Sequence, residues 1–407
     1  MEFEAIKGLF DRYVIGNYAR APIAIARAQG SEVWDTTGKR YLDLLPGLGC
    51  SGVGHCHPHV VAAVQAQAAQ LLHFHNNYYW EAQGRLAELV AKYTAIGGKT
   101  FFANSGTEAS EGALKLARLC APAERRTIVT ALNSFHGRSY GALSATAGDN
   151  FHMGVEPILP GFRYVPLNDL PALEKAFAAK DVAAVYLEPV QGEGGIFPCT
   201  GDYLRGARKL CDQHGALLMF DEIQSGGGRC GRFCAGQVIA PDVKPDVVTY
   251  AKSLGGGLPI GAVHAREGVH QKLAPGTHGS TFGANVVCCA AAIAVFEVIE
   301  RENLFANVTA MAEHLKTVLA GWQKELDCVK EVRQVGLMVG IDLAFPGKAV
   351  IDESLQQGLL INCTHNITLR LLPAMNVTTG QLNEGLGILK QAILKVRAAQ
   401  AQTAGKA

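Results

Sequence analysis

Short apolar runs of β-forming residues alternate with longer segments of helical periodicity through the middle of this chain. Segments 170–178 and 203–214 carry apolar residues at helical spacing. Such alternation predicts an α/β fold, in which a mostly parallel sheet is covered by helices on both faces. The strand-like runs are 127–130, 182–187, 216–220, 247–250 and 260–264.

Polar residues follow three of these runs directly. Glu188 comes after the second run, Asp221 after the third and Lys252 shortly after the fourth. In open α/β sheets the ligand crevice lies outside the carboxyl ends of the strands. We therefore expect the three side chains to contribute to a single site.

Lys252 and Asp221 together suggest a specific chemistry. A lysine at the end of a buried strand can form a Schiff base with the aldehyde of pyridoxal phosphate, and a carboxylate can partner the pyridinium nitrogen of the same cofactor. The pair therefore predicts a pyridoxal-phosphate enzyme, with Lys252 and Asp221 as catalytic residues.

Two further segments fit this cofactor. Ser105, Gly106 and Thr107 precede a helical run at 110–118, and the free N–H groups of a helix N-terminus can bind a phosphate. An ordinary helix cap would show the same residues. Phe135 and Arg138 follow the run at 127–130, where an aromatic ring can stack on a flat cofactor and an arginine can bind a carboxylate. A turn with a core phenylalanine and a surface arginine remains the alternative.

Three other patterns are weaker. Glu188 and Glu193 lie on a glycine-rich loop, where acid–base work, an ion pair or plain solvation are all open. The segment 226–231 matches G-x-G-x-x-G, but it neither follows a strand directly nor opens a helix, so a dinucleotide site is not expected. His55, His57 and His59, with two more histidines downstream, have no usual zinc spacing and predict a packed turn before a helix at 60–72, with no metal.

Composition excludes several classes of function. Lys plus Arg number 37 against 36 Asp plus Glu, so neither nucleic acid nor an acidic membrane has an electrostatic basis for binding. The longest apolar run, 286–296, is too short to span a bilayer, and the N-terminus has no apolar signal region. Eleven cysteines without an export signal predict reduced thiols and a cytoplasmic location.

The length of 407 residues predicts two domains. We expect an N-terminal segment at 1–50 that packs with the small domain, a large cofactor-binding domain at 51–285 and a small α+β domain at 286–407. The last of these would contain long helices from about 286, β-like stretches at 332–342 and 359–372, and a final helix from about Thr379.

These motifs together resemble the class III aminotransferases of fold type I. The resemblance runs from Tyr18 to the last helix. Within the class, the segments 358–365 and 369–373 are most similar to the enzymes that use N2-acetylornithine. The further segments that carry it are Asn17-Tyr18, 54–58, 104–108, 135–138, 188–193, 221–224, 251–257 and 278–282.

The resemblance implies a role for each matching residue. Lys252 would carry pyridoxal phosphate and act as the acid–base, and Asp221 would hold the pyridinium proton. Ser105, Gly106 and Thr107 would bind the phosphate together with Thr281 from a second subunit, which implies a homodimer. Phe135 would stack on the ring, Gln224 would bond its phenolic oxygen, and Glu188 would lie beside the cofactor. For the substrate, the residues would be Tyr18, Arg138, Ser280, Glu193 and Arg370.

The implied reaction is a ping-pong transamination between N2-acetylornithine and 2-oxoglutarate in arginine biosynthesis. Glu193 would mask Arg370 in the first half-reaction and release it to bind the α-carboxylate of 2-oxoglutarate in the second, while Arg138 takes the distal carboxylate. The sequence departs from the family at Cys230, where threonine is usual, and at Ala284, where glycine is usual.

Several alternatives stay open on the sequence alone. Ornithine, succinylornithine or 4-aminobutyrate are substrates of other enzymes of the class, although Tyr18 disfavours 4-aminobutyrate because it resembles a position that suits an α-carboxylate. A mutase or decarboxylase would give the Glu193–Arg370 pair no purpose. A non-enzymatic metal-binding or ligand-binding protein on this fold would have no need of Lys252 and Asp221.

Overall fold

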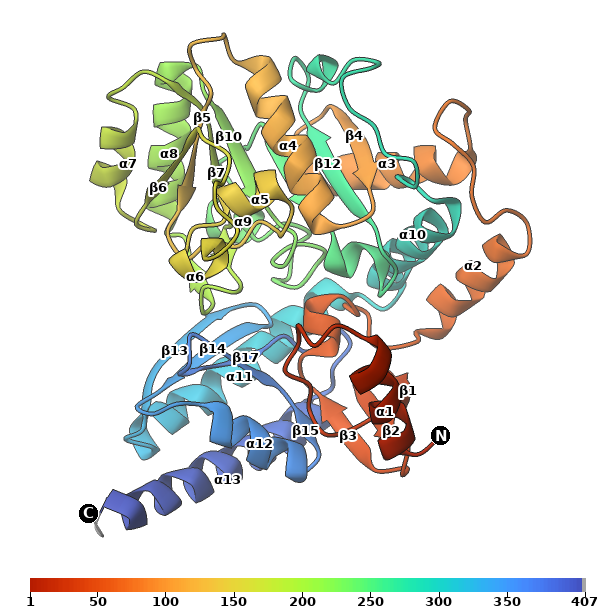
Figure 1. The fold of residues 1–407 in the computed structure, drawn as a ribbon, viewed down its shortest axis with the longest axis vertical. Helices are drawn as coiled ribbons and strands as arrows, with labels where there is room; N and C mark the ends of the chain where they lie inside the picture. The colour runs from red at the N-terminus through yellow and green to blue at the C-terminus, as the bar shows by residue number, and fades with distance from the viewer. Residues whose placement is uncertain (405–407) are drawn as a thin grey trace.

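The computed structural model describes residues 1–404 of the chain. A layered α/β body contains most of the first 285 residues, and a smaller body of helices and two antiparallel-rich sheets lies below it (Figure 1). No helix in the described part of the chain is long and apolar enough to cross a membrane.

A seven-stranded sheet forms the centre of the large body. Its strand order is β4-β12-β11-β10-β7-β5-β6, and β12 alone runs antiparallel to both of its neighbours. The predicted mostly parallel sheet is thereby confirmed. The strands are β4 (Lys99–Ala103), β5 (Thr127–Ala131), β6 (Phe162–Val165), β7 (Val182–Leu187), β10 (Leu217–Asp221), β11 (Val247–Tyr250) and β12 (Gly261–Ala265).

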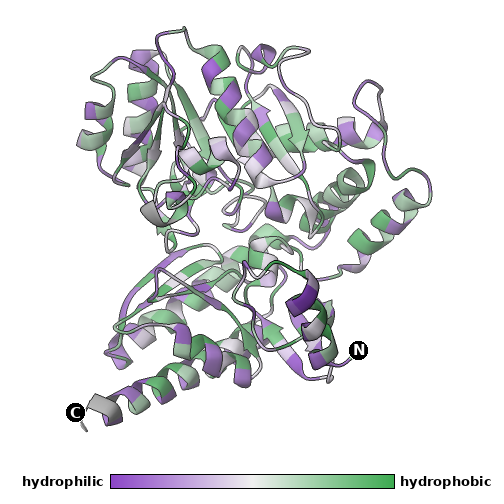
Figure 2. Ribbon diagram, viewed as in Figure 1, coloured by the Kyte–Doolittle hydropathy of each residue, from purple (hydrophilic) through white to green (hydrophobic). Residues whose placement is uncertain are grey.

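Side-chain alternation along β7 explains why the sheet is covered on both faces. Ala184 and Tyr186 belong to one apolar core, which α4 completes, while Val185 and Leu187 belong to a second core formed with α3, α7, α8 and α10. Successive strand residues point to opposite faces, so a strand with apolar residues throughout needs helices on both. Figure 2 shows these strands in hydrophobic colours. The helices are α3 (Glu81–Thr94), α4 (Gly106–Cys120), α7 (Leu170–Ala176), α8 (Gly201–His214) and α10 (Val286–Arg301).

Capping residues set two helix boundaries that periodicity alone placed too late. The Ser105 hydroxyl accepts a hydrogen bond from Glu108 N (3.3 Å), so α4 begins at Gly106. The Thr200 hydroxyl accepts from Tyr203 N (3.2 Å) and begins α8 at Gly201. The strand predicted at 216–220 also ends later than expected, because β10 extends to Asp221.

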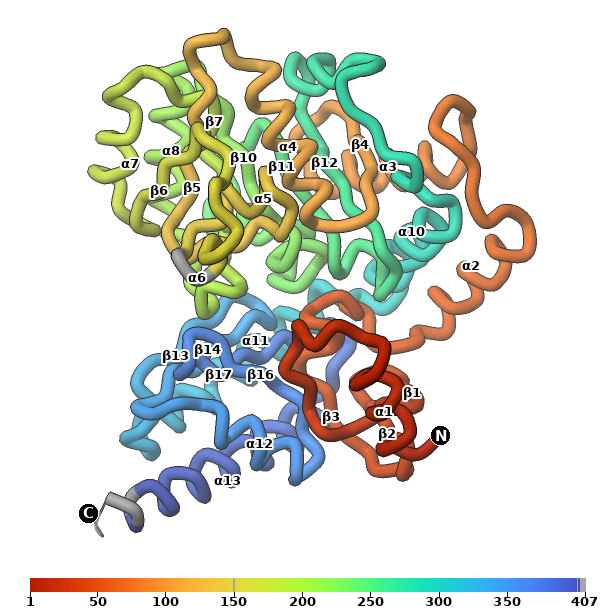
Figure 3. The backbone as a smooth tube through the Cα atoms, in the orientation of Figure 1, coloured from red at the N-terminus to blue at the C-terminus, as the bar shows by residue number. Residues whose placement is uncertain are grey.

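The smaller body contains two four-stranded sheets. One has the order β13-β14-β17-β16, and the other, β1-β2-β3-β15, combines three N-terminal strands with one from the C-terminal third. Leu42 in β3 pairs with Leu359 in β15, and Figure 3 shows the first 50 residues beside the C-terminal segment. The domain boundaries at 50/51 and 285/286 stay a prediction. The strands are β1 (Ile25–Gln29), β2 (Glu32–Asp35), β3 (Arg40–Asp43), β13 (Val329–Val335), β14 (Met338–Leu343), β15 (Leu359–Leu360), β16 (Asn362–Thr364) and β17 (Thr368–Leu371).

Further helices and turns complete the chain. The final helix begins at Thr379, as predicted from the sequence. These elements are α1 (Phe3–Tyr13), α2 (Pro58–Ala68), α5 (Tyr140–Ala145), α6 (Asp149–His152), α9 (Gly236–Ile239), α11 (Leu304–Glu325), α12 (Lys348–Gln356), α13 (Thr379–Ala404), the 3₁₀ turns η1 (Pro46–Gly49), η2 (Lys252–Gly255) and η3 (His270–Lys272), and the short pair β8 (Val190–Gln191) and β9 (Phe197–Pro198).

Candidate active site

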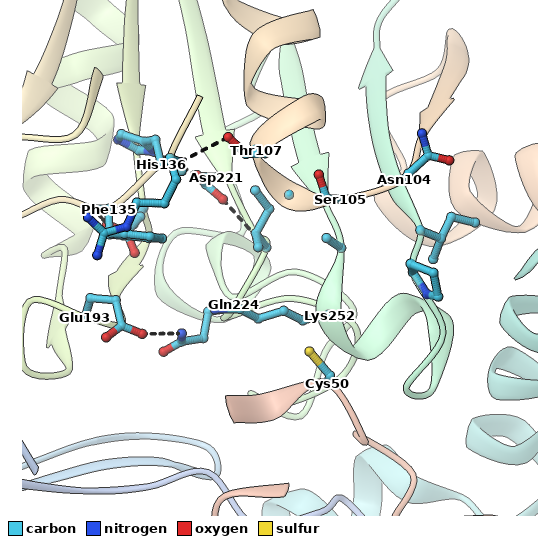
Figure 4. Close-up of a pocket in the computed structure, with 18 of the residues that line it drawn as sticks. Cys50, Asn104, Ser105, Thr107, Phe135, His136, Glu193, Asp221, Gln224 and Lys252 are labelled. Carbon is cyan, nitrogen blue, oxygen red and sulfur yellow. Dashed lines mark hydrogen bonds and ion pairs between the residues drawn. The ribbon is translucent and has the colours of Figure 1, made fainter. Parts of the chain in front are cut away.

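A cavity of about 460 Å³ lies where the central parallel strands end. Figure 4 shows its walls, with Asp221 and Thr107 on one side and Glu193, Gln224 and Lys252 on the other. It brings together ten residues predicted from separate segments of the sequence, which are Ser105, Gly106, Thr107, Phe135, Arg138, Glu188, Glu193, Asp221, Gln224 and Lys252.

Asp221 is held by a buried hydrogen-bond network. Its Oδ2 lies 2.7 Å from Nδ1 of His136 and accepts from the hydroxyl of Tyr186 at 3.0 Å, while its Oδ1 accepts from Ile223 N at 3.0 Å. Tyr186 is bonded in turn to Thr249 Oγ1 at 2.8 Å. The carboxylate is 3% exposed, so its orientation is set by these donors rather than by water. It can therefore present a fixed negative charge to a cationic nitrogen in the cavity.

Lys252 begins η2, separated from the end of β11 by one residue, and its side chain lines the cavity. Burial lowers the pKa of its amine, and the nearby positive charge of Arg370 acts in the same direction, while Glu193 opposes them. A lowered pKa increases the fraction of neutral amine, which is the nucleophilic form. Its φ of +43° is unusual for a residue with a side chain, so the backbone here is strained.

The N-terminus of α4 forms an anion-binding corner of the cavity. The N–H groups of Gly106 and Thr107 have no acceptor within the helix, because they belong to its first turn. Thr107 Oγ1 accepts from the backbone N–H groups of Arg138 and Ser139, both at 3.1 Å, which joins the corner to the loop after β5. A Cβ on Gly137 would approach Thr107 Oγ1 to 2.3 Å, so this contact requires glycine. The corner suits a phosphate.

Glu188 joins two loops of the cavity wall. Its Oε1 accepts from Phe135 N at 2.9 Å, and its Oε2 accepts from Gly192 N at 3.1 Å. Burial raises the pKa of this carboxyl to about 7, against the opposing effect of His136. Glu188 was predicted to contact a cofactor, and it lines the cavity, but both of its oxygens are used to hold the backbone of its neighbours.

Arg138 is exposed at the rim, and its guanidinium lies 5.5 Å from the ring centre of Phe135 and 4.8 Å from that of Phe151. Over the described residues, no acidic side chain forms an ion pair with it. It is therefore available to bind a carboxylate that enters from solvent.

Glu193 and Arg370 form an ion pair at the edge of the cavity. Arg370 Nη1 lies 2.8 Å from Glu193 Oε1, although the two residues are 177 positions apart. Gln224 bridges them, because its Nε2 donates to Glu193 at 3.3 Å and its Oε1 accepts from Arg370 at 3.3 Å. Burial acts to raise the pKa of Glu193, but the charge and hydrogen bond of Arg370 outweigh it and the pKa is lowered. Arg370 is 1% exposed and lies outside the cavity lining, and its predicted masking by Glu193 stays a prediction.

Three predicted residues lie away from this cavity. Tyr18 is 71% exposed and lines a separate hollow beside α1. Ser280 Oγ accepts from Asn104 Nδ2 at 2.9 Å, and no hydrogen bond joins it to Arg138 in residues 1–404. Thr281 is exposed and does not line the cavity of its own chain. Its predicted role from a second subunit stays a prediction.

The three histidines of segment 55–59 lie in ion pairs. His55 pairs with Asp43 at 2.9 Å, His57 with Glu302 at 2.9 Å, and His59 with Glu297. Within residues 1–404, no group of three His, Cys, Asp or Glu side chains could hold a metal ion.

The structure explains how Cys230 and Ala284, the two departures from the family pattern, fit their positions. The thiol of Cys230 donates to Val335 O at 3.5 Å, as a threonine hydroxyl could. Ala284 adopts a left-handed backbone with φ +58°, the conformation that glycine accommodates without strain.

Sequence reasoning missed the supporting residues of the site. His136 lies inside a motif that it singled out, but no role was assigned to it. Tyr186 is inside the run 182–187, where its hydroxyl was the only polar signal. Cys50 lines the cavity from the N-terminal segment, and its burial raises the pKa of its thiol. Their contacts depend on which strands are neighbours, which the sequence does not state.

Comparison with known proteins is consistent with this geometry. A model of the aminotransferase class-III family matches residues 14–393. The chain is a member of the class III aminotransferases. An acetylornithine aminotransferase from Caldanaerobacter subterraneus subsp. tengcongensis is 42% identical over 95% of this chain and 98% of that relative.

Two solved structures that are similar to this chain are named for different substrates. The ornithine aminotransferase of Toxoplasma gondii is 31% identical, with a TM-score of 0.93, and the match covers 98% of this chain and 96% of that one. The N-acetylornithine aminotransferase of Stenotrophomonas maltophilia is 38% identical, with a TM-score of 0.83, over 96% of this chain and 99% of that one. Membership of the class is therefore shown, whereas the choice of amine needs a separate argument.

Proposed function

We propose that this class III aminotransferase transfers an amino group between N2-acetylornithine and 2-oxoglutarate. The products are N-acetylglutamate 5-semialdehyde and glutamate, and the reaction belongs to arginine biosynthesis. The observation that carries the proposal is the Glu193–Arg370 ion pair at the edge of the Lys252 cavity, because it suits an enzyme whose two substrates differ in charge at the reacting carbon. The curated relative at 42% identity supports the choice of acetylornithine.

The residues of the cavity fit pyridoxal phosphate. The N-terminus of α4 suits its phosphate, Asp221 suits its ring nitrogen, and the amine of Lys252 suits its aldehyde. When bound, pyridoxal phosphate supplies an electron sink for the charge left on carbon after a proton is removed. Phe135 lies on the cavity wall, where its ring can cover the face of the cofactor.

Lys252 supplies the acid–base group of the proposed mechanism. Its lowered pKa keeps a fraction of the amine neutral, and Nζ in this form removes the proton from the amine-bearing carbon of the substrate. His136 and Tyr186 hold the carboxylate of Asp221 in place, so its position in the cavity wall is fixed while Lys252 moves the proton. The cavity thus separates a proton-moving group from a fixed charge.

The Glu193–Arg370 pair and the rim arginine sort the two substrates. N2-acetylornithine has no carboxylate on its reacting carbon, so Arg370 can stay paired with Glu193 while Arg138 binds the α-carboxylate. 2-Oxoglutarate has a carboxylate at that carbon, and this group displaces Glu193 and takes the bidentate contact with Arg370. Arg138 then binds the distal carboxylate.

A spectroscopic experiment tests the proposal. Purified protein with pyridoxal phosphate is mixed in turn with N2-acetylornithine, ornithine, succinylornithine and 4-aminobutyrate, and the visible band of the lysine-linked cofactor is followed. Fastest loss of the band with N2-acetylornithine supports the proposal. If ornithine removes the band faster than N2-acetylornithine does, the proposed function is replaced by a second candidate. That candidate is the ornithine aminotransferase activity for which the Toxoplasma gondii protein is named. No band in any sample would refute the enzyme assignment.

We also propose a homodimer and a cytoplasmic location. A dimer would explain why Thr281 and Phe282 are exposed outside their own cavity, and why Leu72, Tyr78 and Tyr79 are 64%, 57% and 105% exposed. Clusters of exposed apolar side chains often mark protein interfaces. Analytical ultracentrifugation measures the assembly, and a monomer at micromolar concentration would contradict it.

A further inference from the structure

The glycine-rich loop 226–231, whose spacing imitates a dinucleotide motif, lies at the seam between the large and small bodies. Leu337 N donates to Arg229 O at 3.0 Å, and Cys230 Sγ donates to Val335 O. A Cβ on Gly228, where φ is +102°, would approach Met375 Sδ to 2.6 Å. The glycines therefore allow close approach between the two bodies, and the loop has a structural purpose that needs no nucleotide.

Arg229 is fully buried, at 0% exposure. Its guanidinium donates only to oxygens without formal charge, and no carboxylate pairs with it anywhere in residues 1–404. The acceptors are Leu372 O (3.0 Å), Pro373 O (2.8 Å), Gly49 O (3.1 Å) and Ser253 Oγ (3.4 Å). Buried cations are normally paired, so this one is retained at a cost.

These acceptors connect the guanidinium to three parts of the active site. Ser253 follows Lys252 in η2, and its hydroxyl also donates to Gly49 O at 2.8 Å. Gly49 precedes Cys50, which lines the cavity. Leu372 follows the end of β17, two residues beyond Arg370. One side chain therefore holds the turn of Lys252 and the strand of Arg370 at a set separation.

We infer that Arg229 is a positioning residue that fixes Arg370 relative to Lys252, and that it acts mainly on the half-reaction with glutamate or 2-oxoglutarate. This inference rests on the proposed function. In the acetylornithine half-reaction Arg370 stays paired with Glu193 and touches no substrate. In the other half-reaction Arg370 binds the α-carboxylate, so a displacement of β17 misplaces the reacting carbon with respect to Lys252 Nζ.

Arg229→Lys is the main test variant, because lysine keeps the charge but presents its donors from one nitrogen, without the planar fork by which the guanidinium reaches acceptors on three segments. Single-turnover rates are measured for the holoenzyme with glutamate and with N2-acetylornithine. We expect the glutamate rate to fall by about 10- to 100-fold, since a displacement near 1 Å has effects of this size, and the acetylornithine rate to fall by less than about 3-fold. Cys230→Ala is the matched control in the same loop, and it should affect both rates equally.

Hydrogen exchange of the cofactor-free protein gives a readout that does not use activity. Leu372 N and Met375 N donate to Leu44 O and Gly52 O, so exchange in 372–376 reports on the seam, and the amides of 253–257 report on η2. Arg229→Lys should accelerate exchange in both segments, whereas Cys230→Ala should not. If Arg229→Lys fails to fold, Ser253→Ala removes one of the contacts and should shift the rate ratio in the same direction by a smaller factor.

The outcomes separate the two proposals. Equal loss of both half-reactions in Arg229→Lys, or unchanged exchange in the two segments, would overturn the positioning role. A wild-type protein that performs neither half-reaction would refute the proposed function instead, and the exchange experiment would still decide whether Arg229 couples η2 to the segment after β17.

Discussion

Replacing Glu193 by glutamine should change the substrate preference of the cavity more than the rate of its chemistry. The pair Glu193–Arg370 is mostly buried, with side-chain exposures of 30% and 1%. Glutamine is nearly isosteric and can still accept a hydrogen bond from Arg370, so the variant removes the negative charge and leaves the packing in place. The α-carboxylate of glutamate then no longer competes with an anion for Arg370.

The size of the effect follows from the electrostatics of this pair. Two unit charges about 4 Å apart interact by about 4 kcal/mol at the effective dielectric constant of about 20 that suits protein sites. The retained hydrogen bond and the partial exposure of Glu193 reduce the difference to roughly 2 kcal/mol. Since about 1.4 kcal/mol corresponds to a tenfold change, the ratio of the two specificity constants should shift roughly 30-fold towards glutamate.

Stopped-flow absorbance of the bound cofactor measures both half-reactions separately, and kcat/KM is determined for glutamate and for N2-acetylornithine. Glu331→Gln is the matched control, because Glu331 also pairs with an arginine, Arg333, but lies on β13 with a side chain 55% exposed. It should leave both values unchanged. A Glu193→Gln variant in which both half-reactions lose the same factor would refute the masking role of Glu193.

Three further changes test other parts of the site. Tyr186→Phe removes the hydroxyl that donates to Asp221. Because a hydrogen bond to a charged group contributes about 1.5–3 kcal/mol, the affinity of the apo-protein for the cofactor, measured by titration, should fall by roughly 10- to 100-fold. An unchanged affinity would contradict the role of this hydrogen bond in holding Asp221. Lys252→Ala should abolish the visible band and slow transamination by at least about 100-fold while the melting temperature is maintained, and a variant that keeps the band would exclude Lys252 as the cofactor lysine. Burial raises the pKa of Glu222 from 4.5 to about 7, so the folded state favours its protonated form. The contribution of this group to the free energy of unfolding is therefore fully present below pH 4.5 and is lost as the pH rises through 7. Urea titrations should therefore show that the stability difference between wild type and Glu222→Gln changes by roughly 3 kcal/mol between pH 4.5 and pH 8, and a constant difference would count against the raised pKa.

The elements of the sheet were predictable where composition alone settled them. The segments 182–187 and 247–250 consist mostly of apolar and β-forming residues, and the strands in the structure have the same limits. The prediction was less accurate where side chains cap an element, as at Ser105, which begins α4 four residues before the predicted run. It also did not anticipate that β12 would run antiparallel, because the pattern of residues inside a buried strand is the same in both directions.

The class of the fold and the chemical groups of the site follow from the amino-acid sequence alone. Apolar alternation predicted a covered parallel sheet, and polar residues at the strand ends identified Lys252 and Asp221, because strand ends converge on one edge in this architecture. The remaining site residues came from a family resemblance.

The residues that support Lys252 and Asp221 are set by tertiary packing. His136 and Tyr186 reach Asp221 across 85 and 35 positions of chain, and Arg229 reaches Leu372 across 143. Such contacts depend on the order of strands in the sheet and on the packing of one body against the other. No local pattern specifies that arrangement, since each of these residues also suits an ordinary buried position in its own segment.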